Sequence, residues 1–167
     1  MASILLPRYS PMKWDDHFFG TIFMSIFFVG IFFGDPTANA IENPRFEKIL
    51  DAIEQVESSG RGKNTPDGDN GKAIGPFQIH MAYWRDACQY DITLAESNYE
   101  RCREPDYARR VVRAYLRRYA KGNLENPEVL ARIHNGGGGI MSKNRNGRAW
   151  RNTTEYWNKV KQELEEN

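Results

Sequence analysis

Residues 43–60 read NPRFEKILDAIEQVESSG, and this stretch decides the fold class because it carries a full set of helix signals. Asn43 is a favourable N-cap, and Pro44 would occupy the first helical position, where its missing N–H costs nothing. The apolar residues that follow recur at helical spacing: Phe46, Ile49, Leu50, Ile53 and Val56. Gly60 can end the helix. We therefore predict an amphipathic helix with Glu57 in its last turn.

Four further helices are predicted downstream. They are expected at about residues 77–88, at residues 105–121, after the cap signal Asn126-Pro127, and behind Thr153 as the N-cap of a last helix. Residues 61–72 are polar, and Asp69-Asn70-Gly71 suits a tight hairpin turn. No repeat or linker is visible. Residues 41–167 are therefore predicted to form one mainly α domain, of the α+β type, with about five helices and a small β-hairpin or loop lobe.

Residues 1–40 have the pattern of a targeting segment. Residues 18–33 read FFGTIFMSIFFVGIFF without a charge, and Ala38-Asn39-Ala40 is an A-x-A cleavage pattern. We predict a secretory signal peptide cleaved after Ala40, which would make the protein secreted, either extracellular or periplasmic. The alternative is an uncleaved signal anchor, which would keep the protein at a membrane.

The composition excludes several classes of protein. Lys and Arg total 23 against 22 Asp and Glu, a net charge of +1, so no nucleic-acid partner is predicted. The two cysteines, Cys88 and Cys102, are too few for a disulfide-dense scaffold or a four-thiolate zinc site. If the protein is exported, they could form a disulfide; the alternative is two buried free thiols.

No cofactor and no metal site are predicted. His80 and His134 are possible zinc ligands, but no third ligand is evident. The DGDNG sequence that begins at Asp67 superficially resembles the start of an EF-hand loop. Its fifth and twelfth positions are Gly71 and Gln78, so two calcium ligands are missing.

Glu57 is the first candidate for chemistry. It follows apolar Val56 at the C-terminal end of the predicted helix, where the last carbonyl groups create a negative potential. That potential and the apolar surroundings both favour a protonated carboxyl group, which could donate a proton in catalysis. The alternative is an ordinary solvated glutamate at a helix end.

Asp67 and Asp69 are candidates for a second carboxylate. Hydrolysis of a glycosidic bond usually requires two carboxyl groups in unlike surroundings, one neutral acid and one ionised partner. A carboxylate on a polar hairpin would suit the second role. The alternative is that these aspartates only shape turns.

A third group of residues lies in two segments, Gly75-Pro76-Phe77-Gln78-Ile79-His80 with Tyr83-Trp84, and Ala131-Arg132-Ile133-His134-Asn135-Gly136-Gly137. Their side chains offer hydrogen-bond donors and acceptors, and their aromatic rings could stack on sugars. On spacing alone, the aromatic residues are better explained as core.

Taken together, these motifs resemble those of invertebrate-type lysozymes, the destabilase family. The resemblance runs from VESSG through AIGPFQIHMAYWRDA, YARRVVRAYLRRYA and ARIHNGG to the final T-x-x-Y-W-x-K-V, or roughly residues 46–160. The VESSG and GPFQI pieces are also similar to the wider superfamily of lysozymes and lytic transglycosylases. The resemblance implies a small, two-lobed lysozyme-like fold whose cleft binds the glycan chain of peptidoglycan.

Carried over by position, the family's catalytic acid falls on Glu57 and its aspartate on Asp69. The loop appears one residue shorter than usual, which leaves Asp67 as a substitute. Gln78, Tyr83, His134 and Asn135 match motif positions that line the substrate cleft. The chain departs from the family in its cysteine content, which is normally high.

The resemblance leads to the prediction of a monomeric, bacteriolytic muramidase that cuts the β-1,4 bond between N-acetylmuramic acid and N-acetylglucosamine. One alternative is a lytic transglycosylase, which needs only the glutamate. Another is a non-catalytic peptidoglycan-binding module. Some family members also cleave isopeptide bonds, but no independent nucleophile signature for that reaction is visible here.

Overall fold

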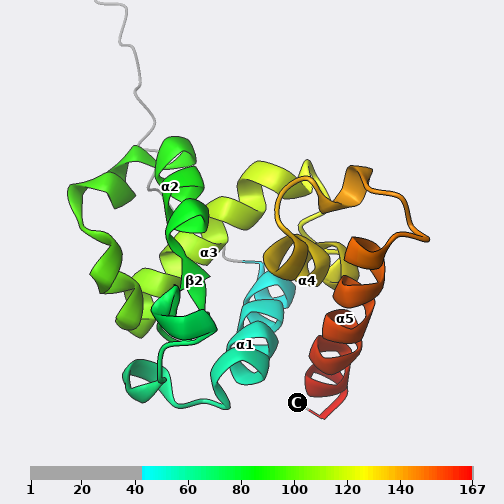
Figure 1. Ribbon diagram of the computed structural model, residues 1–167, viewed down its shortest axis with the longest axis horizontal. Helices are drawn as coiled ribbons and strands as arrows, with labels where there is room; N and C mark the ends of the chain where they lie inside the picture. The colour runs from blue at the N-terminus through cyan, green and yellow to red at the C-terminus, as the bar shows by residue number, and fades with distance from the viewer. Residues whose placement is uncertain (1–42, 167) are drawn as a thin grey trace, which may run out of the picture. The chain divides into compact units, whose positions relative to one another are not determined.

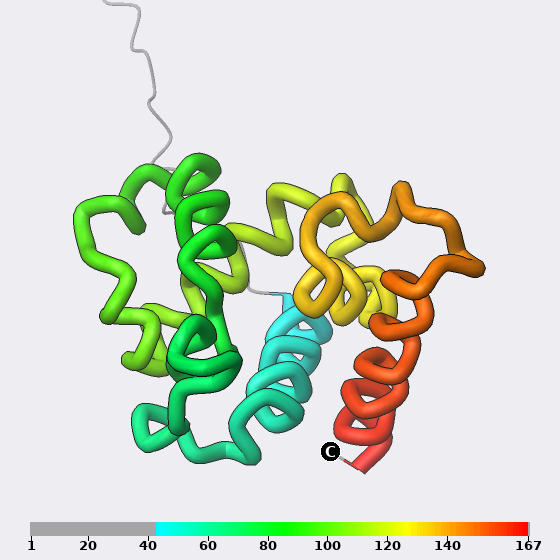
Figure 2. Tube along the Cα trace, in the orientation of Figure 1, coloured from blue at the N-terminus to red at the C-terminus, as the bar shows by residue number. Residues whose placement is uncertain are grey.

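The computed structural model describes residues 43–166. Figures 1 and 2 show five α-helices joined by short 3₁₀ segments and a two-stranded antiparallel sheet. In chain order the elements are α1 (Pro44–Ser58), η1 (Gly62–Asn64), η2 (Asp69–Gly71), β1 (Ala73–Ile74), β2 (Ile79–His80), α2 (Met81–Tyr90), η3 (Ile92–Glu96), η4 (Tyr99–Arg103), α3 (Pro105–Ala120), α4 (Pro127–Gly136), η5 (Ile140–Ser142) and α5 (Arg148–Glu166). The predicted fold class, mainly helical with a small hairpin lobe, is confirmed.

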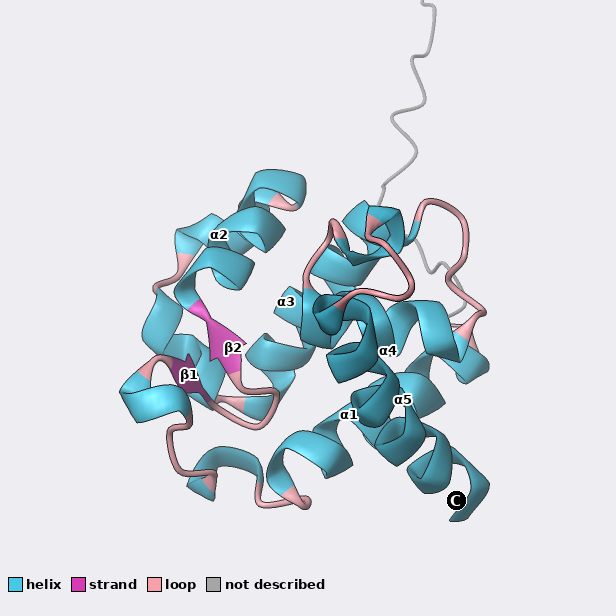
Figure 3. Ribbon diagram, turned by 45° about the vertical axis from the view of Figure 1, so that its right-hand side comes forward, coloured by secondary structure: helices cyan, strands magenta, loops and turns pink. Residues whose placement is uncertain are grey.

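The helices of the described unit pack around one apolar core. Helix α4 packs on α5, α5 on α1, and α2 on α3. Figures 1 and 3 both place β2 and α2 at one end and α4 and α5 at the other, with α1 and α3 between them, and Figure 3 shows β1 beside β2. The fully buried core residues come from every part: Leu50 and Ile53 from α1, Phe77 from the hairpin, Leu116 from α3, Ile133 from α4 and Val160 from α5.

The first helix forms as its sequence signals predict. The Asn43 side chain accepts a hydrogen bond from the N–H of Arg45, and Pro44 occupies the first turn. Ser59 and Gly60 both adopt left-handed backbone angles after the last helical residue, Ser58. Glu57 therefore lies in the last turn of α1.

The predicted turn at Asp69-Asn70-Gly71 also forms, but it closes an isolated bridge, and the hairpin of β1 and β2 turns at residues 75–78. Gly68 and Ala73 exchange two backbone hydrogen bonds, of 2.9 and 3.1 Å, around Asp69-Asn70-Gly71. A second reversal then joins β1 to β2, with Ile74 opposite Ile79. The result is a narrow ribbon that presents Asp67 and Asp69 on its outer turn.

The second helix begins later than predicted, at Met81 rather than near residue 77. Gly75 and Gln78 have φ values of 71° and 47°, so this segment turns the hairpin and cannot be helical. A β-carbon at Gly75 would collide with the carbonyl of Cys102, so this turn requires glycine. Phe77 and Ile79 are buried because this turn packs into the core.

The prediction that Thr153 caps the last helix is wrong, because α5 already begins at Arg148. Thr153 is buried inside the helix, where its hydroxyl accepts a 2.9 Å hydrogen bond from Arg132 of α4. The Arg132 guanidinium also lies 4.2 Å from the centre of the Trp150 ring. The hydroxyl therefore helps to hold α4 against α5.

Cys88 and Cys102 are free thiols in the structure, so the proposed disulfide is absent and the alternative of two buried thiols is found. Both side chains belong to the apolar core. Burial raises the pKa of both thiols, that of Cys102 to about 12, which keeps them protonated. Here the cysteines act as small core residues.

The predicted signal peptide, residues 1–40, lies outside the described residues. Within residues 43–166, none of the helices has both the length and the apolar character to cross a bilayer.

Candidate active site

Glu57 projects from the last turn of α1 toward α4, and its side chain is 19% exposed. It faces His134, whose Nε2 atom lies 3.4 Å from Glu57 Oε1. The His134 side chain is only 4% exposed. The carboxyl group therefore faces a buried imidazole, which contradicts the simple picture of a solvated helix-end glutamate.

The His134 ring is held at its other nitrogen by Tyr83. The Tyr83 hydroxyl lies 3.1 Å from His134 Nδ1. The Tyr83 ring stacks on Tyr115 of α3, with centroids 3.5 Å apart. Tyr83 and His134, which the sequence predicts as substrate-contacting residues, are thus brought together with Glu57.

Tyr156 of α5 completes the surroundings of Glu57. Its ring lies against His134, with centroids 6.1 Å apart. Its hydroxyl is buried and lies near the Glu57 carboxyl group. Burial, and secondarily the nearby Glu57 carboxylate, raise the pKa of Tyr156 well above its usual value. Sequence reasoning did not single out Tyr156, although the motif T-x-x-Y-W-x-K-V contains it.

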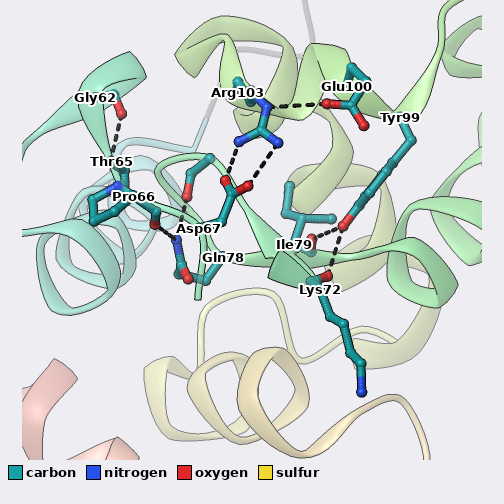
Figure 4. A network of polar contacts seen from close by, with 11 residues as sticks. Gly62, Thr65, Pro66, Asp67, Lys72, Gln78, Ile79, Tyr99, Glu100 and Arg103 are labelled. Atoms are coloured by element: carbon teal, nitrogen blue, oxygen red, sulfur yellow. Dashed lines mark hydrogen bonds and ion pairs between the residues drawn. The ribbon is translucent and has the colours of Figure 1, made fainter. Parts of the chain in front are cut away.

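On the hairpin, Asp67 is committed to an ion pair. Arg103 of η4 donates two hydrogen bonds to its carboxylate, and the same guanidinium binds Glu100 at 3.2 Å (Figure 4). The hydrogen bond from Arg103 lowers the pKa of Asp67. Asp67 therefore anchors the hairpin to η4, and no sequence signal identified Arg103 as its partner.

Asp69 has different surroundings, although it lies only two residues further along the chain. Its side chain is 55% exposed, and the only ion-pair partner found among the described residues is His80, with 3.8 Å between Oδ2 and Nε2. Asp69 also has a left-handed backbone, with φ at 47°. Of the two aspartates, Asp69 is the one whose carboxylate is free to meet a ligand.

Gln78 serves the hairpin itself. Its side-chain amide donates to the carbonyl of Pro66 at 3.2 Å (Figure 4) and to that of Gly75 at 3.0 Å. A β-carbon at Gly68 would collide with Gln78 Oε1, so the side chain also packs closely on the turn. These contacts make Gln78 a support for the loop that carries Asp69, and its predicted contact with substrate stays a prediction.

Asn135 is exposed at the end of α4 and faces a shallow recess of about 450 Å³. Tyr156 lines the same recess, as do Asn152, Glu155 and Lys159 of α5. The recess is polar and lies beside the aromatic surroundings of Glu57. Asn135 is the one predicted contact residue whose side chain points to open space of this kind.

Metal chemistry finds no ready ligand set here. Among residues 43–166, no three His, Cys, Asp or Glu side chains are grouped so as to hold a metal ion.

A helical domain with a short antiparallel ribbon, one carboxyl group half-hidden at a helix end and a second on the ribbon's turn, defines a lysozyme-like protein. The comparison with family models agrees: the model described as Destabilase matches residues 47–163, and the chain belongs to this family, the invertebrate-type lysozymes. The family is related to glycosidases, which indicates an enzyme. A comparison with curated proteins gave no match.

Proposed function

We propose that this protein is a secreted muramidase that hydrolyses the β-1,4 bond between N-acetylmuramic acid and N-acetylglucosamine in bacterial peptidoglycan. The observation that carries the proposal is the placement of Glu57, a partly buried carboxyl group at a helix end that faces His134 and two tyrosines. Such surroundings suit a general acid. Family membership supports the same class of activity.

In this mechanism Glu57 donates its proton to the glycosidic oxygen as the bond breaks. Asp69, whose carboxylate is exposed on the turn, stabilises or attacks the anomeric carbon from the opposite side. Asp67 is less suited to this role because Arg103 already occupies its carboxylate. A separation of about 5 Å between the two carboxyl groups would predict retention of anomeric configuration.

The second candidate is a lytic transglycosylase, which closes an anhydro-sugar with the glutamate alone. The exposure of Asp69 and its long contact to His80 favour this candidate, because neither holds the carboxylate firmly in place. Export, which both candidates need, is proposed from the pattern of residues 1–40 and not from the described part of the chain.

The test is mass spectrometry of fragments released from purified peptidoglycan in ¹⁸O-labelled water. Hydrolysis predicts reducing muropeptides that carry one ¹⁸O atom at the new anomeric hydroxyl. Transglycosylation predicts unlabelled anhydro-muropeptides, lighter by one water. Binding to the wall without release of either product would contradict both candidates and leave a glycan-binding module.

A further inference from the structure

The recess of about 450 Å³ between the end of α4 and the first half of α5, called here the α4–α5 recess, borders the candidate acid. Its polar side chains are Asn135 of α4 and Asn152, Glu155 and Lys159 of α5. Tyr156 lines the recess as well, and the Tyr156 hydroxyl lies near the Glu57 carboxyl group. One shared side chain therefore connects the recess with the surroundings of Glu57.

The four polar side chains of the α4–α5 recess are exposed, and none has a hydrogen bond or an ion pair within residues 43–166. Glu155 and Lys159 have the four-residue spacing, glutamate first, that favours an ion pair on a helix. They form none, whereas Lys161 and Glu165 of the same helix lie 3.6 Å apart. Two opposite charges at the recess are thus left for a ligand.

The proposed reaction determines which part of the substrate lies next to Glu57. A muramidase cuts the bond on the reducing side of N-acetylmuramic acid, so this sugar sits directly beside the catalytic acid. Its lactyl group carries the stem peptide. Successive residues of an extended peptide advance by about 3.5 Å, so the first two or three remain within about 10 Å of the sugar. The stem therefore starts on the surface beside Glu57, where the recess lies.

Charge distinguishes the stem from the rest of the substrate. The sugar rings and their acetamido groups are neutral, whereas the stem has free carboxylates and, on the diamino acid at its third residue, an amine. Glu155 and Lys159 are about 6 Å apart along the axis of α5. One anion and one cation at this separation match a short peptide that carries both charges. They offer little to a neutral sugar.

We propose that the α4–α5 recess binds the stem peptide of N-acetylmuramic acid. The Lys159 ammonium pairs with a stem carboxylate, and the Glu155 carboxylate pairs with the amine of the diamino acid. Asn135 and Asn152 hydrogen-bond the peptide groups of the stem. This inference rests on the proposed muramidase function, and it makes Lys159 and Glu155 specificity-determining residues that favour peptide-bearing glycan over bare glycan.

The test compares intact peptidoglycan with the same glycan after an amidase has removed its stems. The kcat/KM of Lys159→Gln on intact peptidoglycan should fall by about fivefold, the size expected for one exposed ion pair. On the stem-free glycan, its kcat/KM should equal that of the unaltered protein. Lys159→Glu should lose more on intact peptidoglycan, because it places a second negative charge beside Glu155.

The matched control is Lys161→Gln, which removes an ammonium group that pairs with Glu165. It should leave kcat/KM unchanged on both substrates, and melting temperatures check the fold of every variant. An equal loss on both substrates with Lys159→Gln, or no loss on intact peptidoglycan, would overturn the proposal.

Salt provides a readout that a role in packing would not move. The Debye length falls from about 10 Å at 0.1 M salt to about 3 Å at 1 M. The difference in kcat/KM between Lys159→Gln and the unaltered protein should therefore shrink at high salt. A difference of the same size at both salt concentrations would contradict the ion pair with the stem.

Binding to the recess can be measured without catalysis. The probe is the disaccharide of N-acetylglucosamine and N-acetylmuramic acid that carries a tetrapeptide, titrated into the full chain. The backbone amide signals of Asn152 and Lys159 should shift with this probe and stay in place with the same disaccharide without its peptide. Absence of the shift would overturn the proposal. If the shift occurs and no sugar product is released in any assay, the muramidase function fails while the stem-binding site stands.

Discussion

The two candidate carboxyl groups, Glu57 and Asp69, lie in regions that differ in burial and in the groups that surround them. Around Glu57 the protein places buried aromatic and imidazole rings from α2, α4 and α5. Asp69 lies on an exposed turn beside a network of ion pairs, in which Arg103 links Asp67 to Glu100. One carboxyl group is surrounded by buried rings, and the other is exposed beside charged side chains. Glycoside cleavage requires this kind of contrast.

The same contrast appears within α1. Glu54 lies almost one turn before Glu57, and both side chains are 19% exposed. Glu54 accepts a 3.0 Å hydrogen bond from Arg109 of α3, while Glu57 faces His134. Equal burial therefore leads to different chemistry, because the partner of each carboxylate differs.

The largest expected effect follows from removing the acid. Glu57→Gln should lower the rate of peptidoglycan cleavage by about 1,000-fold without loss of folding, because the amide cannot donate the proton. Release of reducing ends, with circular dichroism for the fold, measures this. Glu54→Gln is the matched control and should retain most of the activity. Similar losses in both variants would remove the distinction between the two glutamates.

The second test of this comparison is a substitution of Asp69 on the hairpin. Asp69→Asn should reduce hydrolysis by about 10- to 100-fold, because a neutral amide stabilises the developing positive charge poorly. The kcat on peptidoglycan is the measurement. Nearly unchanged kcat together with anhydro-muropeptide products would instead establish the transglycosylase.

A smaller effect is expected on stability. Arg103 lowers the pKa of Asp67 from its ordinary value near 3.8, so this carboxylate stabilises the folded state above that pH. The stabilisation should disappear as the pH falls through the lowered pKa. The difference in melting temperature between the unaltered protein and Asp67→Asn should therefore be present at pH 6 and vanish in strong acid. In an Arg103→Gln background, Asp67→Asn should produce no such pH dependence.

The smallest effect concerns the cysteines. Because Cys88 and Cys102 are free thiols, a reducing agent should leave the melting temperature unchanged. Thermal unfolding with and without dithiothreitol measures this. A lower melting temperature after reduction would show that the protein forms the disulfide.

Local signals predicted the parts of this structure that depend on neighbours in the sequence. The cap and proline at Asn43-Pro44 predicted α1, and Asp69-Asn70-Gly71 predicted the turn between Gly68 and Ala73. The signals failed where tertiary contacts override them. Thr153 has the chemistry of a cap, but its hydroxyl binds Arg132 instead.

The site shows the same limit. The sequence predicted Glu57, Tyr83 and His134 as separate candidates, yet 51 residues separate Tyr83 from His134, and only the packing of α2 near α4 reveals their contact. The sequence left Asp67 and Asp69 as alternatives. The choice depends on Arg103, which is 36 residues from Asp67 and carried no signal of its own.

The most direct test of the acid role compares two leaving groups. A natural glycan linkage needs a proton on its departing oxygen, whereas a 2,4-dinitrophenyl glycoside of the same sugar departs without one. The kcat/KM of Glu57→Gln should therefore fall by about 1,000-fold on the glycan. On the activated glycoside, its kcat/KM should stay close to that of the unaltered enzyme. An equal loss on both substrates would contradict the account, because Glu57 would then be needed for something other than its proton.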